Sequence, residues 1–329
     1  MKAIVQERYG SHEVLHLGEI DKPVAGDNEV LVRVVAAGVG PDVWHFMTGR
    51  PYLVRIIGFG FFKPKAPVRG SDLAGVVEAV GINVTKFQVG DEVFGNCDGA
   101  RTNGAFAEYA VAKESRIARK PTNISFEQAA AIPISANTAL LGLRGVGQLK
   151  AGQKVAIIGA GGGVGSFAVQ IANSIGAEVT GICSTSKMEL VRSIGATHVV
   201  DYTTEDFVDG LNTYDLILDT AGRRSLKQLR GALKPDGVIA IVGGEGGGKI
   251  LGGFGRQIFV APFKSMFSTQ KFRAVTLKTE DTDFDTLTNL VESGAVTPVI
   301  DSTYSLATAS DAVKHLAEGH AAGKIVLTI

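Results

Sequence analysis

The stretch KVAIIGAGGGVG, at residues 154–165, decides the fold of this chain. It reads as a buried apolar strand followed by a glycine turn, and the apolar run SFAVQIA at 166–172 predicts a helix directly after the turn. Glycines in such a turn let backbone amides approach a pyrophosphate at the helix N-terminus, where the N–H groups are unpaired and the dipole is positive. Glycine turns are common in loops, but this position between strand and helix favours a dinucleotide-binding site.

A second strand is predicted at residues 178–183, about twenty residues beyond the glycine turn, as a βαβ unit requires. NAD sites usually carry Asp or Glu at the end of this strand, where the carboxylate accepts a hydrogen bond from the ribose 2′-hydroxyl. Here the strand ends in STSK, from Ser184 to Lys187. Hydroxyls and an ammonium group would bind a 2′-phosphate that a carboxylate would repel, so the sequence predicts NADPH. Ser184 or Ser186 is also a candidate N-cap of the next helix, which is compatible with phosphate binding.

Composition excludes several classes of function. The 329 residues carry a formal net charge of zero, so no basic field exists to drive nucleic-acid binding. Two cysteines cannot form a disulfide framework, which favours a reducing compartment, and we expect a cytoplasmic protein. The chain opens on a strand-like pattern rather than a secretory signal, and we expect no membrane span because no apolar run approaches about twenty residues.

The pattern of predicted secondary structure changes once along the chain, which predicts an α/β protein of two domains. Up to about residue 120 the pattern is rich in short strands punctuated by Gly and Pro, which indicates a mainly antiparallel β domain. Helices and strands then alternate, which indicates a doubly wound parallel sheet of the Rossmann type. Its strands are predicted at 155–158, 179–182, 198–200, 216–218, 238–242 and 273–276. A helix at 310–318 and a strand at 324–327 are expected to return to the first domain, giving domains of 1–123 with 299–329, and 124–298.

Several signatures in order resemble the medium-chain dehydrogenase/reductase superfamily, in its zinc-free quinone-oxidoreductase and enone-reductase branch. They are AAGVGPD at 36–42, GSDLAGVV at 70–77, VGDEVFG at 89–95, GAFAEY at 104–109, the glycine turn and GKIVL at 323–327. The resemblance covers nearly the whole chain. It implies a GroES-like catalytic domain, a Rossmann domain that binds NADPH, and a homodimer joined through the Rossmann sheets.

The residues that hold catalytic zinc in alcohol dehydrogenases of this superfamily are Cys, His and Cys. The matching positions here are Gly40, Ser71 and Ile134, and two cysteines cannot build a four-cysteine structural site. His45 is the nearest histidine and has no thiolate partner in the sequence pattern, so we expect a packed or polar histidine there. The prediction is a protein without zinc.

This absence bears on the reaction, because zinc eases alcohol oxidation by stabilising the alkoxide. Quinones and α,β-unsaturated carbonyls spread the incoming charge themselves, so the predicted function is NADPH-dependent reduction of such apolar acceptors. The alternative is a catalytically weak dinucleotide-binding protein with a structural or regulatory role, since a cofactor site does not prove turnover. An NADPH-oxidation assay separates the two.

The resemblance adds cofactor contacts at Thr138, near the nicotinamide, and at Tyr202, beside the 2′-phosphate. Val242, Gly243 and Gly244 end a Rossmann strand where the ribose of the cofactor passes. The predicted cofactor-binding residues are Thr138, Gly161, Gly162, Gly163, Val164, Ser184, Lys187, Tyr202, Ala221, Val242, Gly243 and Gly244.

Catalytic candidates are fewer. Tyr52 follows a loop start, Gly49-Arg50-Pro51, in a region that lines the active-site cleft of the family. It is predicted either to donate a hydrogen bond to the substrate oxygen or to lie at the rim as an amphipathic residue. Asp42 is expected to cap the helix that follows it. Gly40 stands where many zinc-free members carry Asn, which removes a polar contact.

Residues 246–271 combine glycines with apolar and basic side chains, among them Phe254, Phe259, Phe263 and Lys264. A contiguous apolar patch of this kind should not stay exposed on a monomer. Three interpretations follow, in this order of preference: a lid on the substrate pocket, a dimer interface, or a contact with a membrane surface.

Overall fold

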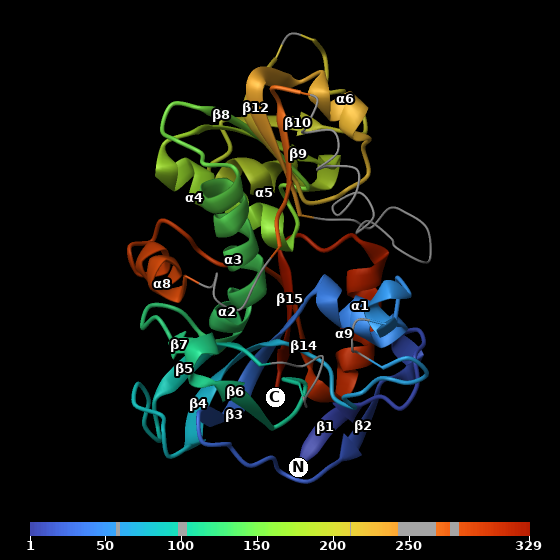
Figure 1. Ribbon diagram of the computed structural model, residues 1–329, viewed down its shortest axis with the longest axis vertical. Helices are drawn as coiled ribbons and strands as arrows, with labels where there is room; N and C mark the ends of the chain where they lie inside the picture. The colour runs from blue at the N-terminus through green and yellow to red at the C-terminus, as the bar shows by residue number, and fades with distance from the viewer. Residues whose placement is uncertain (57–59, 98–103, 211, 243–267, 277–282) are drawn as a thin grey trace. The chain divides into compact units, whose positions relative to one another are not determined.

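The computed structural model describes residues 1–56, 60–97, 104–210, 212–242, 268–276 and 283–329 (Figure 1). It divides into two compact units, the first formed by residues 1–134, 282–292 and 298–329, the second by 135–281 and 293–297. The predicted division at residue 123 differs from this one. Helix α2 (Phe126–Ala130) packs on strands of the first unit, so the chain leaves that unit only after α2.

A sheet of seven strands forms the centre of the first unit. Six strands lie in the order β14-β15-β3-β4-β5-β7, and β6 pairs with β3. Their bounds are β3 Glu29–Val39, β4 Asp72–Val80, β5 Glu92–Asn96, β6 Tyr109–Lys113, β7 Ile117–Arg119, β14 Ile300–Ser305 and β15 Lys324–Thr328. β1 (Lys2–Val5) and β2 (His16–Glu19) pair as a separate two-stranded sheet, and Ala3 and Ile4 of β1 are buried in the core of the first unit. The last strand returns to this unit as predicted, because β15 pairs antiparallel with β3.

Helices and short turns complete the first unit and lead out of it. They are η1 His12–Val14, α1 Pro41–Thr48, η3 Glu114–Arg116, α2, α8 Phe284–Glu292, η8 Leu306–Thr308 and α9 Ala309–Glu318. Helix α3 (Pro133–Leu140) begins in the first unit and continues into the second. Helix α9 buries Ala309, Ala312 and Val313 in the same apolar core as the inward side chains of β3 and β4.

The second unit is built on a parallel sheet in the order β10-β9-β8-β11-β12-β13. Its strands are β8 Lys154–Ile158, β9 Glu178–Cys183, β10 His198–Asp201, β11 Tyr214–Asp219, β12 Leu233–Ile241 and β13 Lys271–Ala274. Helical segments between them are η4 Leu141–Val146, α4 Gly163–Ile175, η5 Thr185–Lys187, α5 Met188–Ser193 and α6 Leu226–Arg230. The chain runs outward from β8 to β10 and then crosses back to β11, so the strand order reverses beside β8. Ligands of doubly wound sheets bind at the carboxyl ends of the strands at such a reversal.

A strand occurs at each predicted Rossmann position, but two differ in their bounds. β13 lies at Lys271–Ala274 rather than at 273–276, and β12 begins before the predicted residue 238. The sequence predicts a strand from Val238, after the turn-like Pro235-Asp236-Gly237, but the structure pairs Leu233 with Tyr214 before the register shifts and Val238 pairs with Leu216. Residues 235–237 therefore lie within β12, at the place where its pairing with β11 shifts register. Central strands are apolar along their length because helices cover both faces of a parallel sheet.

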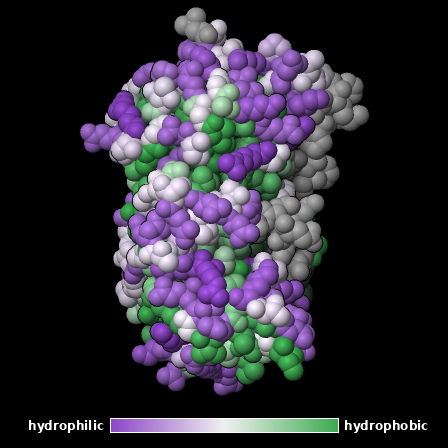
Figure 2. All heavy atoms as spheres, turned by 90° about the vertical axis from the view of Figure 1, so that its left-hand side faces the viewer, coloured by the Kyte–Doolittle hydropathy of each residue, from purple (hydrophilic) through white to green (hydrophobic). Residues whose placement is uncertain are grey.

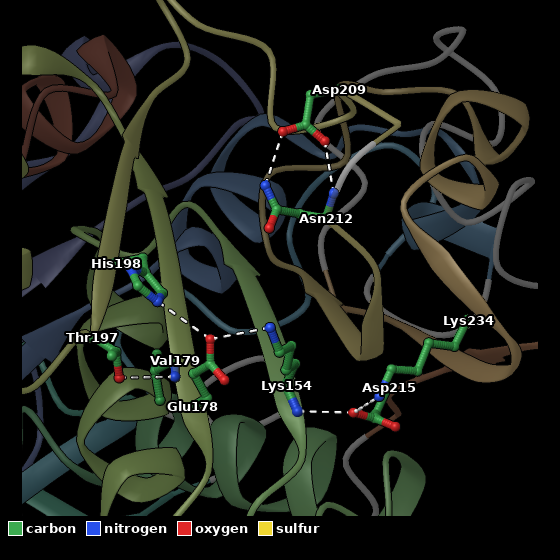
Figure 3. Close-up of polar contacts among 9 residues, drawn as sticks. All are labelled: Lys154, Glu178, Val179, Thr197, His198, Asp209, Asn212, Asp215 and Lys234. Atoms are coloured by element: carbon green, nitrogen blue, oxygen red, sulfur yellow. Dashed lines mark hydrogen bonds and ion pairs between the residues drawn. The ribbon is translucent and has the colours of Figure 1, made fainter.

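Polar contacts join the amino ends of these strands, at the edge away from the glycine turn (Figure 3). Oε1 of Glu178 lies 3.4 Å from the Lys154 ammonium and 3.2 Å from Nε2 of His198. Asp215 binds the Lys154 backbone amide at 2.8 Å and the Lys234 ammonium at 2.9 Å. On the face drawn in Figure 2, hydrophilic residues make up most of the coloured surface, in agreement with cores buried inside each unit.

Candidate cofactor and active site

The glycine turn lies between β8 and α4 in the second unit, as predicted. Gly162 is the N-cap of α4, and Gly163 and Val164 begin its first turn. A Cβ on Gly165 would lie 2.0 Å from the carbonyl oxygen of Gly159, so glycine is required for the helix to approach the strand. A Cβ on Gly162 would meet one atom, the same oxygen at 3.3 Å, so the space beside this residue is open.

Lys187 lies across this turn. A Cβ placed on Gly161 would come within 2.8 Å of both Cβ and Cδ of Lys187, so the lysine stem packs directly on the glycine backbone. The turn and the lysine come from two separate βα units, and the structure brings these two predicted cofactor elements together. Backbone amides at a helix N-terminus beside an ammonium group suit the pyrophosphate and phosphate groups of a dinucleotide. The residues present therefore fit that cofactor.

Ser184 and Tyr202 follow the neighbouring strands β9 and β10. Ser184 occupies the N-cap position of η5, but its Oγ lies 3.3 Å from Oγ of Ser186 and makes no capping bond. The predicted cap is thus correct in position and wrong in its side-chain contact. Tyr202 is 49% exposed, and its amide donates to the Cys183 carbonyl at 3.1 Å, which ties it to the end of β9.

A carboxylate stands at the end of β10, where the sequence analysis did not place one. Asp201 pairs in register with Cys183 and accepts hydrogen bonds from the Thr185 hydroxyl and from the amide and hydroxyl of Thr203, at 2.9 and 2.7 Å. These hydrogen bonds, that of Thr185 first, hold the pKa of Asp201 below its ordinary value. The sequence signal that points to this carboxylate is an Asp directly after the predicted strand at 198–200, the next strand after the STSK loop.

The remaining cofactor candidates lie on neighbouring elements of the second unit. Ala221 follows β11, and a Cβ on Gly159 would lie 3.8 Å from its Cβ, which places Ala221 beside the glycine turn. The Val242 amide donates to the Asp219 carbonyl at 2.9 Å at the end of β12. Thr138 is buried on α3. Gly243, Gly244 and residues 246–267 lie outside the described residues.

The positions matched to zinc ligands surround two carboxyl groups in the first unit. Ser71 donates to Oδ2 of Asp42 at 2.8 Å, and the amide of Ile134 donates to Oδ1 of Asp72 at 3.1 Å. A Cβ on Gly40 would lie 2.6 Å from Oδ1 of Asp42. The expected capping by Asp42 is wrong, because Gly40 is the N-cap of α1 and Asp42 lies inside the first turn. Its carboxylate still suits the positive end of the helix dipole.

Asp72 is fully enclosed at the start of β4 and faces a buried cation. The Lys324 ammonium lies 3.6 Å from its Oδ2, and both side chains are 3% exposed. Burial raises the pKa of Asp72 to about 6, although Lys324, the Ile134 amide and Asn96 favour the ionised form. Burial thus disfavours the negative charge of Asp72, and the nearby ammonium of Lys324 partly offsets this effect.

Within the part of the chain that the structure describes, no three His, Cys, Asp or Glu side chains gather so that they could hold a metal ion. His45 lies on α1, and its Nδ1 is 2.9 Å from the Arg50 carbonyl oxygen. A histidine held by a backbone carbonyl is a packed residue of the kind that the sequence predicted.

Tyr52 is 39% exposed, and the guanidinium of Arg55 lies over its ring at 5.0 Å. The same guanidinium lies 4.2 Å from the ring centre of Tyr9 and donates to the Gly49 carbonyl at 2.9 Å. Both predicted roles of Tyr52 agree with this exposure.

Among the described residues, no helix has the length and apolar character needed to cross a bilayer.

Two family models match the chain: an alcohol dehydrogenase GroES-like domain over residues 26–122 and a zinc-binding dehydrogenase domain over residues 194–327. A tomato (Solanum lycopersicum) protein named 2-methylene-furan-3-one reductase is 33% identical, over 99% of this chain and 79% of its own length. The chain belongs to the medium-chain dehydrogenase/reductase superfamily, in its quinone-oxidoreductase branch.

Two further comparisons agree with membership of this branch. A chloroplastic NADPH-dependent alkenal/one oxidoreductase of Arabidopsis thaliana is also 33% identical over 99% of this chain and 79% of its own length. The solved structure of a quinone oxidoreductase from Coxiella burnetii superposes with a TM-score of 0.85 at 26% identity, covering 100% of this chain and 99% of the other. The predicted superfamily and the predicted pairing of a GroES-like domain with a Rossmann domain are confirmed.

Proposed function

We propose that this protein is an NADPH-dependent, zinc-independent reductase of quinones or α,β-unsaturated carbonyls. The observation that carries the proposal is Lys187 packed on the glycine turn, in a chain of the quinone-oxidoreductase branch. The strand-end loop offers an ammonium group and serine hydroxyls to a 2′-phosphate, as NADPH binding requires. The names of the two plant relatives are consistent with a conjugated carbonyl as acceptor.

The residues of this chain would hold the cofactor by its phosphates. The amides at the start of α4 would bind the pyrophosphate, and Lys187 with Ser184 and Tyr202 would hold the 2′-phosphate. When bound, the cofactor supplies the hydride. An acceptor that is a quinone or enone delocalises the incoming charge onto its oxygen, and Tyr52 is our candidate to donate a hydrogen bond to that oxygen.

The residues at the positions matched to zinc ligands support independence from zinc. Gly40 has no side chain, Ile134 is apolar, and the hydroxyl of Ser71 already donates to Asp42. Three ligand atoms of the Cys or His type are therefore lacking at these positions. A reductase of conjugated acceptors does not need a Lewis acid, because the acceptor itself stabilises the charge that develops.

The test is an assay of NADPH oxidation with a panel of quinones and enones, run beside saturated alcohols with NADP⁺. We expect acceleration by at least one conjugated acceptor and no reduction of NADP⁺ by alcohols. Robust alcohol oxidation without turnover of any conjugated acceptor would overturn the reaction class. Tight NADPH binding without turnover of any substrate would favour the alternative, a dinucleotide-binding protein with a structural or regulatory role.

A further inference from the structure

Asp201 links two loops at the edge of the Rossmann sheet where the cofactor is proposed to bind. Its side chain is 3% exposed, and each carboxylate oxygen is bound by a different threonine. Thr185 belongs to the loop after β9, and Thr203 to the loop after β10. The two hydroxyl oxygens are 3.3 Å apart, so the carboxylate and both threonines form one closed cluster.

This cluster sits between the residues proposed to hold the 2′-phosphate. Thr185 lies within η5, which Ser184 precedes and Lys187 ends, and Thr203 directly follows Tyr202. Backbone contacts reinforce the link, since the Tyr202 amide donates to Cys183 and the Glu205 amide donates to the Asp201 carbonyl at 2.8 Å. The Asp201 carboxylate therefore supplies the side-chain link between the two loops, beside the backbone bond that joins Tyr202 to Cys183.

The direction of the hydrogen bonds also matters. Both threonine hydroxyls donate their protons to Asp201, which leaves their lone pairs for any other partner. A phosphate needs donors, so these threonines are poor ligands for it, and the ammonium of Lys187 with the neighbouring hydroxyls must supply them. Three donors within the protein, the hydroxyls of Thr185 and Thr203 and the Thr203 amide, stabilise the negative charge of Asp201.

We propose that Asp201 is a positioning residue that sets the preference for NADPH over NADH by fixing the Thr185 and Thr203 loops. The inference rests on the proposed NADPH-dependent function. The carboxylate itself does not contact the cofactor. The two threonine hydrogen bonds hold the loops that bind the 2′-phosphate at the spacing which this phosphate requires.

The first test is Asp201→Asn, with dissociation constants for NADPH and NADH measured by calorimetry. The amide keeps one acceptor oxygen for Thr203, but its nitrogen cannot accept the proton of Thr185. We expect the dissociation constant of NADPH to rise about tenfold, as for the loss of one charge-assisted hydrogen bond, and that of NADH to change less than about twofold. Asp215→Asn is the matched control, because Asp215 accepts comparable hydrogen bonds at the opposite edge of the same sheet.

Thr185→Val and Thr203→Val provide a second route if the Asp201 variant does not fold. Each removes one donor to the carboxylate while keeping the volume of the side chain. We expect either variant to lower the NADPH/NADH preference, and the double variant to lower it by less than the product of the two single effects, since one cluster is broken in each case. Unchanged preference in both threonine variants would overturn the inference.

The outcomes separate this inference from the proposed function. If the wild-type protein binds NADH more tightly than NADPH, the proposed cofactor is wrong and the inference falls with it. If the wild type prefers NADPH and Asp201→Asn keeps that preference, the proposed function stands and the positioning role is refuted. Tighter NADPH binding by Asp201→Asn would show that the carboxylate repels the phosphate, which also refutes the role.

Discussion

At the scale of single residues, the side chain of Lys187 connects the two predicted cofactor-binding segments, the glycine turn after β8 and the loop after β9. Its stem packs on the backbone of Gly161 in the glycine turn, although Lys187 comes from the loop after the next strand. A long, flexible lysine loses much of its rotamer entropy on ordering, and the packing on the glycine backbone reduces the further loss on binding.

We predict that Lys187→Ala raises the dissociation constant of NADPH about tenfold or more and that of NADH little. One charge-assisted contact contributes about 1.5–3 kcal/mol, and NADH lacks the phosphate that forms it. Calorimetry with both cofactors checks this. Lys154→Ala is the control, because Lys154 lies at the amino edge of the same sheet. Equal weakening of both cofactors by Lys187→Ala would contradict the assignment.

Tyr52 provides the second prediction at this scale. If its hydroxyl donates to the oxygen that gains charge, Tyr52→Phe lowers turnover about tenfold or more and leaves cofactor affinity nearly unchanged, because that bond strengthens as charge develops. Steady-state kinetics and cofactor titration measure the two effects separately. Tyr202→Phe should show the opposite pattern. A small change in turnover removes Tyr52 from the mechanism, since a water molecule then fills the role, and leaves the reaction class intact.

At the scale of elements, the glycine turn contains two glycines with different functions. At Gly165 a Cβ would meet the Gly159 backbone at 2.0 Å, whereas at Gly162 the nearest atom is at 3.3 Å. The first glycine is needed for packing of α4 on β8. The second leaves open the space into which a pyrophosphate would bind.

We therefore predict that Gly165→Ala lowers both stability and cofactor affinity, while Gly162→Ala lowers cofactor affinity with a small change in stability. Overpacking against backbone costs about 1–3 kcal/mol, which corresponds to a fall in the melting temperature of several degrees. Thermal unfolding without cofactor and calorimetry with it distinguish the two variants. Equal melting temperatures for both variants would show that helix and strand adjust to the added methyl group.

β15 lies between β14 and β3 in the sheet of the first unit, and its first residue, Lys324, is buried beside Asp72. We predict that Lys324→Met destabilises the protein by about 3 kcal/mol near pH 8, because the Asp72 carboxylate is then buried without its cation. The pKa of Asp72 is already raised to about 6 by burial, and loss of Lys324 raises it further.

The sign follows from proton binding. A folded state that holds a proton more tightly than the unfolded state gains stability as pH falls. The loss of stability in Lys324→Met should therefore shrink between about pH 8 and pH 5.5, as Asp72 becomes protonated. Melting temperatures of both proteins across this range check it. A deficit that stays constant with pH would mean that the lysine acts through packing alone.

At the scale of the whole molecule, the two family-model matches do not coincide with the two units. The GroES-like match lies within the first unit, whereas the dehydrogenase match at 194–327 spans parts of both units. The positions matched to zinc ligands lie around Asp42 and Asp72, where the Lys324 ammonium lies 3.6 Å from Oδ2 of Asp72.

We predict that the purified protein contains no stoichiometric zinc and keeps its activity in the presence of chelators. Gly40, Ser71 and Ile134 lack the thiolate and imidazole ligands that zinc prefers. Elemental analysis together with an activity assay after chelation is the measurement. About one zinc ion per chain, with activity lost on its removal, would overturn the prediction.

Local patterns were sufficient to predict the Rossmann half of the molecule. Apolar strands alternate with helical segments along much of this region, and a glycine turn joins the first strand to its helix. That alternation is typical of parallel strands joined by right-handed crossovers. The glycine turn and the Lys187 loop were predicted because both follow directly from the end of a strand. The irregular pairing of β12 was missed, because turn residues inside a strand are decided by the partner strand.

The sequence by itself determined the superfamily, the two kinds of domain and the glycine cradle, because each is marked by short motifs of residues close in the chain. The tertiary structure alone decided the carboxylate clusters. Asp72 meets Lys324 because β4 and β15, far apart in the sequence, both pair with β3 and begin at the same end of the sheet. Asp201 meets Thr185 because the neighbouring strands β9 and β10 end side by side. Whether a carboxyl group caps a helix, pairs with a cation or positions a loop depends on its neighbours in space and on its burial, and neither is encoded in a local pattern.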